Sequence, residues 1–208
     1  MKEYHKINSI YKRDMSKPNK PFILGDWAEP EFAYLQNNEW EWTEKIDGTN
    51  IRVMFDGKEI SFGGKSENAQ IPAKLVKVLQ DRFLPQLNLF KEKFPDGVCL
   101  YGEGFGASIQ SGGNYIPDGV DFILFDVLIG NYWLSRENVN EIADTLSLKK
   151  VHIVGKGTIA EAIELVKKGF NSVIGTAKAE GLVIRPTTEL FNRKGERIVT
   201  KIKTRDFN

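Results

Sequence analysis

The chain has 208 residues, of which 41% are hydrophobic and 27% are charged. This length and balance fit one substantial folded domain, with or without a small appendage, and exclude a disordered chain. The formal net charge is only +1, so whole-chain charge does not mark the protein as a nucleic-acid binder. The single cysteine, Cys99, excludes an intramolecular disulfide, and with two histidines there are too few ligands for a Cys/His zinc site.

These features favour a cytoplasmic setting. Cys99 lies in an apolar run and is typical of a buried, inert thiol in a reducing compartment. No apolar stretch is long enough to span a bilayer, and no signal-peptide pattern heads the chain. We therefore expect a cytoplasmic protein with no membrane partner, and a phage-encoded protein in the cytoplasm of its host would fit equally well.

The first part of the chain, residues 1–39, is predicted to be an irregular lead-in that packs on a domain of residues 40–208. Pro18, Pro21 and Pro30 interrupt regular structure there. Basic residues gather in this lead-in and again near the end of the chain, where they either neutralise phosphates or remain solvated charges. They are Lys2, Lys6, Lys12, Arg13, Lys17 and Lys20, and then Arg193, Lys194, Arg197, Lys201, Lys203 and Arg205.

The middle of the chain contains predicted strands and one long helical stretch. Residues 51–62, centred on an Asp-Gly pair, predict a β-hairpin with a tight turn. Residues 72–93 have helical spacing, and Pro85 should kink or split that helix. Apolar runs at 97–103 and 120–129 predict two further strands, the second of them central.

The last third of the chain adds two helices and two strands. A helix capped by serine is predicted over 135–146. A capping box at 158–161 begins a second helix, and Gly169 ends it. Strands are predicted at 181–185 and 197–203. Because strands and helices do not alternate regularly, the order predicts an α+β fold with antiparallel sheets flanked by helices.

The segment most informative about chemistry is Lys45-Ile46-Asp47-Gly48, which lies between two predicted strands. A lysine at a sheet edge has a fixed backbone, and the glycine lets the chain approach a ligand closely. Lys, Asp and Gly are also common in turns, so this segment taken alone is more typical of a charged turn.

Several further motifs follow this segment in order, and together they resemble the covalent nucleotidyltransferase superfamily of DNA ligases, RNA ligases and messenger-RNA capping enzymes. The matching segments are Lys45-Ile46-Asp47-Gly48, Phe62-Gly63-Gly64-Lys65-Ser66, Leu100-Tyr101-Gly102-Glu103, Phe122-Ile123-Leu124-Phe125-Asp126, Glu180-Gly181-Leu182-Val183-Ile184 and Lys201-Ile202-Lys203. The resemblance extends from about residue 40 to residue 203 and implies an ATP-grasp-like nucleotidyltransferase domain, the adenylation domain of ligases.

The resemblance also implies roles for individual residues. Lys45 would become attached to AMP, with Asp47, Lys201 and Lys203 as the other catalytic residues. Asp47 and Glu180 would hold Mg²⁺ or Mn²⁺. The residues expected to contact ATP are Glu44, Ile46, Asn50, Arg52, Lys65, Glu103, Phe125, Glu180, Lys201 and Lys203. Within this set, Glu103 would hold a ribose hydroxyl and the ring of Phe125 would stack on the purine.

Structural alternatives remain for five of these residues. Lys201 and Lys203 alternate with an apolar residue, as any half-buried strand would, but their cationic face must point somewhere and a phosphate pocket explains two lysines on one side. Phe125 is also typical of a core residue in an apolar strand, and Lys65 of a solvated charge on a hairpin. The backbone of Glu44 would recognise the base, or its side chain would be solvated.

The chemistry of the lysine agrees with this interpretation. A lysine amine attacks phosphorus only in its neutral form, although an ordinary lysine has a pKa of about 10.4. A neighbouring cation or a dry pocket favours the neutral amine. Lys201, Lys203 and Mg²⁺ are candidates for that cation, and the same charges would stabilise the negative charge on phosphorus and on the departing pyrophosphate.

The form Glu-Lys-Ile-Asp-Gly-Thr-Asn is similar to the RNA ligase 2 group, whose members often have histidine at the position of Asp47. Many DNA ligases and capping enzymes instead have arginine at the position of Asn50. The resemblance therefore implies an ATP-dependent RNA ligase that adenylylates itself on Lys45, transfers AMP to a 5′-phosphate RNA end and joins that end to a 3′-hydroxyl. RNA would be bound as a nicked duplex, an RNA/DNA hybrid or free ends.

Four other interpretations stay open: a small DNA ligase, a GTP-dependent capping guanylyltransferase, a non-catalytic nucleotide- or nucleic-acid-binding domain, and an α+β domain with chance motif matches. Members of the superfamily usually carry a further C-terminal OB-fold or helical domain, and the five residues after Lys203 leave no room for one. We therefore expect a minimal ligase, a truncated one, or one whose partner protein supplies that domain.

Overall fold

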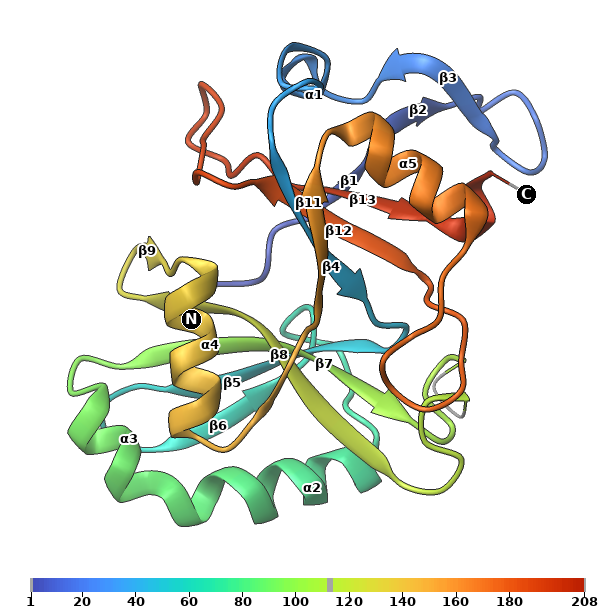
Figure 1. Ribbon diagram of the computed structural model, residues 1–208. Helices are drawn as coiled ribbons and strands as arrows, with labels where there is room; N and C mark the ends of the chain where they lie inside the picture. Colours follow the sequence, from blue (N-terminus) through green and yellow to red (C-terminus); the bar gives the residue numbers. More distant parts are fainter. Residues whose placement is uncertain (1, 112–113, 208) are drawn as a thin grey trace. The chain divides into compact units, whose positions relative to one another are not determined.

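The computed structural model describes residues 2–111 and 114–207. The chain forms two compact units (Figure 1). Unit 1 comprises Met1–His5 and Asp47–Val151, and unit 2 comprises Lys6–Ile46 and His152–Asn208. Each unit has its own sheet and its own hydrophobic core.

Unit 1 is built on a mostly antiparallel sheet in the order β10-β8-β7-β5-β6, with β9 added to β8. Its strands are β5 (Thr49–Phe55), β6 (Ile60–Gly63), β7 (Val98–Gly106), β8 (Val120–Ile129), β9 (Tyr132–Trp133) and β10 (Lys149–Lys150). The exception is β10, which pairs with β8 in parallel. The apolar run at 120–129 therefore forms a strand with the predicted bounds, flanked by neighbours on both sides.

Helices cover the sheet of unit 1 and complete its core. They are α2 (Ala73–Phe83), the 3₁₀ turn η1 (Leu84–Gln86), α3 (Leu87–Lys93) and α4 (Arg136–Thr145). The predicted split of residues 72–93 is confirmed, because η1 contains Pro85, whose ring cannot continue an α-helix. Phe83 and Phe90 flank this turn, and both are fully buried in the core. Ser135 caps α4 as predicted, by accepting a hydrogen bond from the backbone N–H of Asn138.

Unit 2 is built on a five-stranded sheet in the order β1-β13-β12-β4-β11. Its strands are β1 (Asn8–Ser9), β4 (Trp40–Lys45), β11 (Ile153–Gly157), β12 (Gly181–Pro186) and β13 (Thr200–Lys203). The neighbours are antiparallel except for β1 and β13, which are parallel. The remaining elements of unit 2 are the paired strands β2 (Tyr11–Arg13) and β3 (Phe22–Trp27), the helices α1 (Pro30–Tyr34) and α5 (Ile159–Lys168), and the 3₁₀ turn η3 (Thr204–Asp206).

The two faces of this sheet differ because its strands alternate apolar and polar residues. On one face, Trp42, Leu182 and Ile202 join a core that also contains Ile163 and Val166 of α5. The predicted capping box is confirmed at the start of α5, and Gly169 ends the helix. The other face is formed by the side chains that alternate with these core residues, and it includes the lysines of β4 and β13.

Two expectations about unit 2 are wrong. The lead-in is not irregular, because β1, β2 and β3 form within it. The aromatic rings of Tyr11, Phe22 and Trp27 pack on one another, and fully buried Ile10 contributes to the core, so local apolar contacts outweigh the proline interruptions. The last strand is also shorter than 197–203, because Arg197 instead bridges to Phe191 and pairs with Glu189. A domain boundary at residue 40 stays a prediction.

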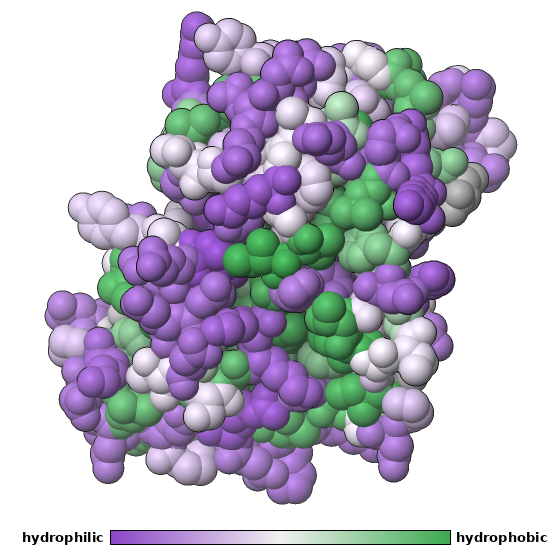
Figure 2. Space-filling view, in the orientation of Figure 1, coloured by the Kyte–Doolittle hydropathy of each residue, from purple (hydrophilic) through white to green (hydrophobic). Residues whose placement is uncertain are grey.

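Hydrophilic side chains cover most of the face seen in Figure 2. Among the helices of the described residues, none is both long and apolar enough to cross a membrane.

Candidate active site

The polar face of the unit 2 sheet brings Lys45 and Lys203 into one row. Gly181 of β12 pairs with Lys45 of β4 on one side and with Lys203 of β13 on the other. Cross-strand partners point to the same face of a sheet, and glycine places no side chain between the two lysines. A Cβ at Gly181, whose φ is +154°, would lie 2.8 Å from the Cα of Lys203 and still closer to the carbonyl of Ile202. Glycine is therefore required by the close approach of β12 and β13.

Glu180 joins the two lysines. Its Oε2 accepts a hydrogen bond from Lys45 Nζ at 2.6 Å, and its Oε1 lies 2.5 Å from Lys203 Nζ. The backbone holds the glutamate at this position, because the N–H of Thr204 donates to the carbonyl of Glu180 at 2.9 Å. The structure thus brings together three of the predicted residues. Lys45 precedes Glu180 by 135 positions in the chain, and Lys203 follows it by 23.

This cluster is shielded from water but still open to a ligand. The side chains of Lys45, Glu180 and Lys203 are 20%, 12% and 16% exposed. Partial burial strengthens each interaction among the three charges relative to bulk water. Two cations on one carboxylate leave one positive charge in excess, so the cluster attracts an anion. An amine, a carboxylate and a second cation in contact are the parts that nucleotidyl transfer to a lysine needs.

Lys201 lies on the same face as Lys203, two residues earlier on β13. Ile202 between them is fully buried in the core, so the two lysines project from the opposite face. Lys201 pairs with Val183 of β12 and with Ser9 of β1. The predicted cationic face of this strand is confirmed.

Glu44 occupies the other face of β4 and is not solvated. It is 2% exposed, and its Oε2 accepts a hydrogen bond from the backbone N–H of Val173 at 3.2 Å. Its own N–H donates to the carbonyl of His152 at 2.9 Å. Glu44 therefore ties β4 to the segment that leads into Glu180. Ile46, which follows Lys45, is buried, and its carbonyl is 3.5 Å from Lys45 Nζ.

In unit 1, the predicted nucleoside contacts gather at β5 and β7. Asn50 and Glu103 are direct cross-strand partners and share one face of the sheet. The Oδ1 of Asn50 is buried and accepts no hydrogen bond within the described part of the chain. A Cβ at Gly48 would contact the carbonyl of Gly104 and the side chain of Glu103, so the backbone passes very close to β7 there. The Oδ1 of Asn50 can accept a hydrogen bond, and so can the neighbouring carboxylate of Glu103. Two such acceptors side by side suit the binding of hydroxyl groups, which donate hydrogen bonds.

Three other predicted residues of unit 1 have separate environments. Arg52 is buried, and its Nε donates to the carbonyl of Gly64 at 2.9 Å, which gives it a structural partner in the turn after β6. Lys65 is exposed in that turn. The carboxylate of Asp47 accepts from the backbone N–H of Ser111 at 3.3 Å.

Phe125 is half-buried on β8, and its ring lies 5.1 Å from that of Tyr4 in an edge-on arrangement. The neighbouring Asp126 is fully buried and accepts a hydrogen bond from the Tyr4 hydroxyl at 2.8 Å. No sequence pattern indicates this contact, because Tyr4 is more than a hundred residues away from Asp126. The same holds for Tyr115, whose hydroxyl accepts from the backbone N–H of Asp47 at 3.2 Å.

Within the part of the chain that the structure describes, few side chains that could bind a metal ion lie close together. Among the described residues, no three His, Cys, Asp or Glu side chains gather in one place. Mg²⁺ does not need such a cluster, because it is commonly held by one or two carboxylates together with waters and substrate phosphates. Glu180 supplies hard carboxylate oxygens on the face that carries Lys45, so its chemistry fits this mode of binding.

Comparison with known proteins identifies the fold. The structure is similar to the Naegleria gruberi RNA ligase with PPi, with a TM-score of 0.65 and 20% identity over 86% of this chain and 53% of that chain. An apo mutant of that ligase matches with a TM-score of 0.67 and 18% identity, over 99% and 58% of the two chains. A mutant with ATP and Mn matches with a TM-score of 0.67 and 18% identity, over 95% and 62%.

The chain therefore spans between about half and three-fifths of the length of these solved chains. The predicted α+β nucleotidyltransferase-type fold is confirmed. The sequence also matches the family described as RNA ligase over residues 38–203. Because this match covers most of its length, the chain belongs to the RNA ligase family.

Proposed function

We propose that this protein is an ATP-dependent RNA ligase that attaches AMP to Lys45, transfers it to the 5′-phosphate of an RNA end and joins that end to a 3′-hydroxyl. The observation that carries the proposal is the ion-paired cluster of Lys45, Glu180 and Lys203, in which the lysine amine is 2.6 Å from a carboxylate oxygen. Membership of the RNA ligase family supports the choice of reaction. The Naegleria gruberi ligase structures with ATP and Mn, and with AMP and Mn, support the choice of nucleotide and metal.

In the first step, the nitrogen of Lys45 forms a bond to the α-phosphorus of ATP, and the bond from that phosphorus to the pyrophosphate oxygen breaks. The ammonium must lose one proton before its nitrogen attacks, and Glu180 is the carboxylate in contact with it. The nitrogen loses a second proton once it is bonded to phosphorus. Lys201 and Lys203 would face the growing negative charge of the phosphate oxygens from β13. When the amine is neutral, Lys203 still balances the charge of Glu180.

A divalent ion, when bound, would neutralise charge on the phosphates and position them for attack. Glu180 is the residue that we propose to hold it, directly or through water, and Asp47 is the second proposed ligand. In unit 1, Glu103 and Asn50 would bind the ribose, Phe125 would stack on the base, and Lys65 would reach a phosphate. Glu44 and Arg52 would act by holding the backbone around the site, since both side chains have backbone partners.

The later steps follow from the same chemistry. The 5′-phosphate oxygen of RNA attacks the phosphorus of the lysine adduct, so the P–N bond breaks and an RNA with a 5′-adenylyl group forms. The 3′-hydroxyl then attacks the 5′-phosphate of that RNA and releases AMP. We include a nicked duplex and an RNA/DNA hybrid among the proposed substrates, and a partner protein as the proposed source of a C-terminal domain. The proposed setting is the cytoplasm, where the buried thiol of Cys99 would stay reduced.

The test is incubation with α-labelled ATP or α-labelled GTP and Mg²⁺, followed by a denaturing gel. ATP should label the wild-type protein and Lys168→Ala, whose exposed lysine ends α5, the helix that packs on the opposite, apolar face of the sheet. Lys45→Ala should remain unlabelled. The labelled protein should then seal RNA ends when offered 5′-phosphate and 3′-hydroxyl strands. Labelling by GTP alone would point to a capping guanylyltransferase, and sealing of DNA alone to a DNA ligase; either result would contradict the proposal.

A further inference from the structure

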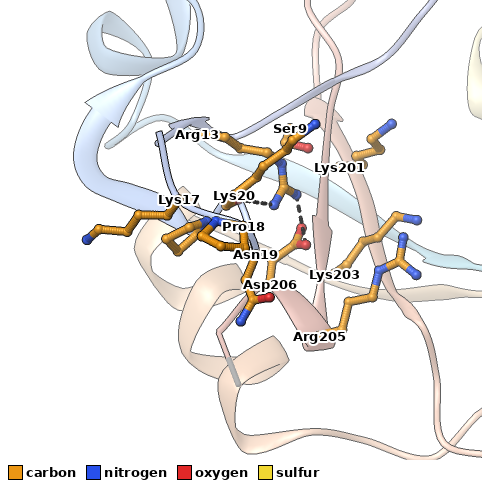
Figure 3. A pocket seen from close by; sticks show the side chains of 11 residues that line it. Ser9, Arg13, Lys17, Pro18, Asn19, Lys20, Lys201, Lys203, Arg205 and Asp206 are labelled. Carbon is orange, nitrogen blue, oxygen red and sulfur yellow. Dashed lines mark hydrogen bonds and ion pairs between the residues drawn. The ribbon is translucent and has the colours of Figure 1, made fainter. Parts of the chain in front are cut away.

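Unit 2 contains a pocket of about 920 Å³ between the β2–β3 hairpin and the end of β13 (Figure 3). Its lining is strongly cationic, and its one carboxylate, that of Asp206, already pairs with Arg13. The cationic residues are Arg13, Lys17, Lys20, Lys201, Lys203 and Arg205. A pocket with this charge attracts an anion with several negative charges.

Contacts within unit 2 hold the guanidinium of Arg13 in place on the hairpin. The Nη2 of Arg13 is 2.8 Å from Asp206, its Nη1 donates to the carbonyl of Lys20 at 3.1 Å, and its guanidinium lies 4.5 Å from the centre of the Phe22 ring. Arg205 is exposed, and within the described residues it forms no ion pair. Figure 3 shows Lys203 and Arg205 extending to the same side, whereas Lys17 extends away from them. Arg13, Lys203 and Arg205, together with Lys20, which also lines the pocket, are the cations that we expect a bound anion to meet.

The pocket is continuous with the cluster around Lys45, because Lys203 belongs to both. Only β12 lies between β4 and β13, so the backbones of Lys45 and Lys203 are about 10 Å apart, two strand spacings. In a transfer at phosphorus, the attacking atom and the leaving oxygen lie roughly in line on opposite sides. With the α-phosphate beside Lys45 and Lys203, the leaving pyrophosphate points away from β4, toward β13 and β1. The cationic pocket lies on that side.

We propose that this pocket binds the β- and γ-phosphates of ATP and holds the pyrophosphate as it leaves, with Arg13, Lys20 and Arg205 as binding residues beyond the family motifs. The inference rests on the proposed function, because it takes Lys45 as the nucleophile. The chain contributes two basic segments that are far apart in sequence, and each of them supplies one wall of the pocket.

The assignment is tested by measuring, with calorimetry, the affinity of the AMP-free protein for inorganic pyrophosphate. Arg205→Ala and Lys20→Ala should each weaken binding about tenfold, as loss of one charge-assisted contact does. Lys12→Ala is the matched control, because Lys12 is on the same hairpin but pairs with Asp26 outside the pocket, and its affinity should stay within about twofold. Arg13→Lys tests Arg13 without removing the partner of Asp206. Unchanged affinity in both Arg205→Ala and Lys20→Ala would overturn the assignment.

A second experiment tests whether the pocket binds the phosphates of the nucleotide or those of RNA. Arg205→Ala and Lys20→Ala should slow AMP attachment from ATP and pyrophosphate-driven removal of AMP, but should seal a pre-adenylylated RNA at the wild-type rate. If the variants instead keep their pyrophosphate affinity and lose sealing of pre-adenylylated RNA, the pocket binds RNA and the proposal is wrong. Pyrophosphate affinity is measured without catalysis, so a wild-type protein that takes no AMP but shows the expected pattern would refute the proposed function alone.

Discussion

At the scale of single residues, the cluster on the polar face depends on two features that a motif match does not explain. Glu180 contacts both lysines, so one carboxylate holds two cations together and leaves one positive charge in excess. Gly181 allows β12 and β13 to approach, which places Lys45 and Lys203 in the same row. Alternation on β13 predicted which residues face away from the core, but the contacts of Glu180 arise from pairing between distant strands and have no local signal.

Glu180→Gln keeps the size of the side chain and removes its charge. Lys45 and Lys203 would then face each other without a carboxylate to balance them, and the proposed metal would lose a ligand. We expect AMP attachment to slow by about 100-fold or more, the loss typical of removing a charged group from a transition state. Glu164→Gln, in an exposed pair on α5, is the control and should retain the wild-type rate. A wild-type rate of labelling in Glu180→Gln would contradict the role given to Glu180.

Gly181→Ala tests the close approach of the two strands. The added methyl group would overlap the backbone of Ile202 and Lys203, so β13 must shift away from β12. We expect both a lower melting temperature and slower AMP attachment. Gly195→Ala is the control, because its φ of +75° is also unfavourable for alanine but the space around it is open. If both variants lose the same stability, the strand contact has no special role.

At the scale of elements, the features predicted from sequence were those with local causes. The capping box of α5, the break in the helix at Pro85 and the alternation on β13 all depend on residues a few positions apart. The irregular lead-in was a wrong prediction because β2 and β3 pair with each other despite the prolines, and β1 pairs with β13 at the other end of the chain. Ser9 on β1 pairs with Lys201 on β13, and such a parallel contact between chain ends leaves no pattern in either segment.

In unit 1, Asp121 connects three elements, since it pairs with Arg82 of α2 at 2.6 Å and with Lys149 of β10 at 2.7 Å. Burial acts to raise the pKa of Asp121, but hydrogen bonds from Lys149 and the backbone of Phe122, with the charge of Arg82, outweigh it and bring the pKa below its ordinary value. A lowered pKa means that the folded state favours the ionised form. This stabilisation is therefore present above the ordinary pKa and is lost as the pH falls through the lowered value.

Asp121→Asn should lower the free energy of unfolding by about 1–2 kcal/mol at neutral pH, because two cations lose a charged partner. The difference from the wild-type protein should shrink below about pH 4, where the wild-type carboxyl also becomes protonated. Denaturant unfolding at several pH values measures both effects. Asp144→Asn, which removes an exposed pair with Lys150, should change stability far less. A destabilisation of Asp121→Asn that is the same at every pH would exclude the ionic contribution.

At the scale of the whole molecule, the order of motifs predicted the family, and the match over residues 38–203 confirms it. Order along the chain was sufficient because each motif lies at a strand or at a strand end that the fold then positions. The order of motifs could not predict the pocket beside β13, since the pocket is lined by residues from two distant segments, 9–21 and 201–206. The basic residues of both segments were visible, but their common location depends on the pairing of β1 with β13.

The central claim is that Lys45 carries the nucleotide, and intact-protein mass spectrometry followed by peptide mapping tests it most directly. Protein freed of bound AMP is incubated with ATP and Mg²⁺, beside Lys45→Ala and Lys168→Ala. We predict one AMP adduct, located on Lys45, in the wild-type protein and in Lys168→Ala, and none in Lys45→Ala. An adduct on another residue, or a folded wild-type protein that takes no AMP, would contradict the account.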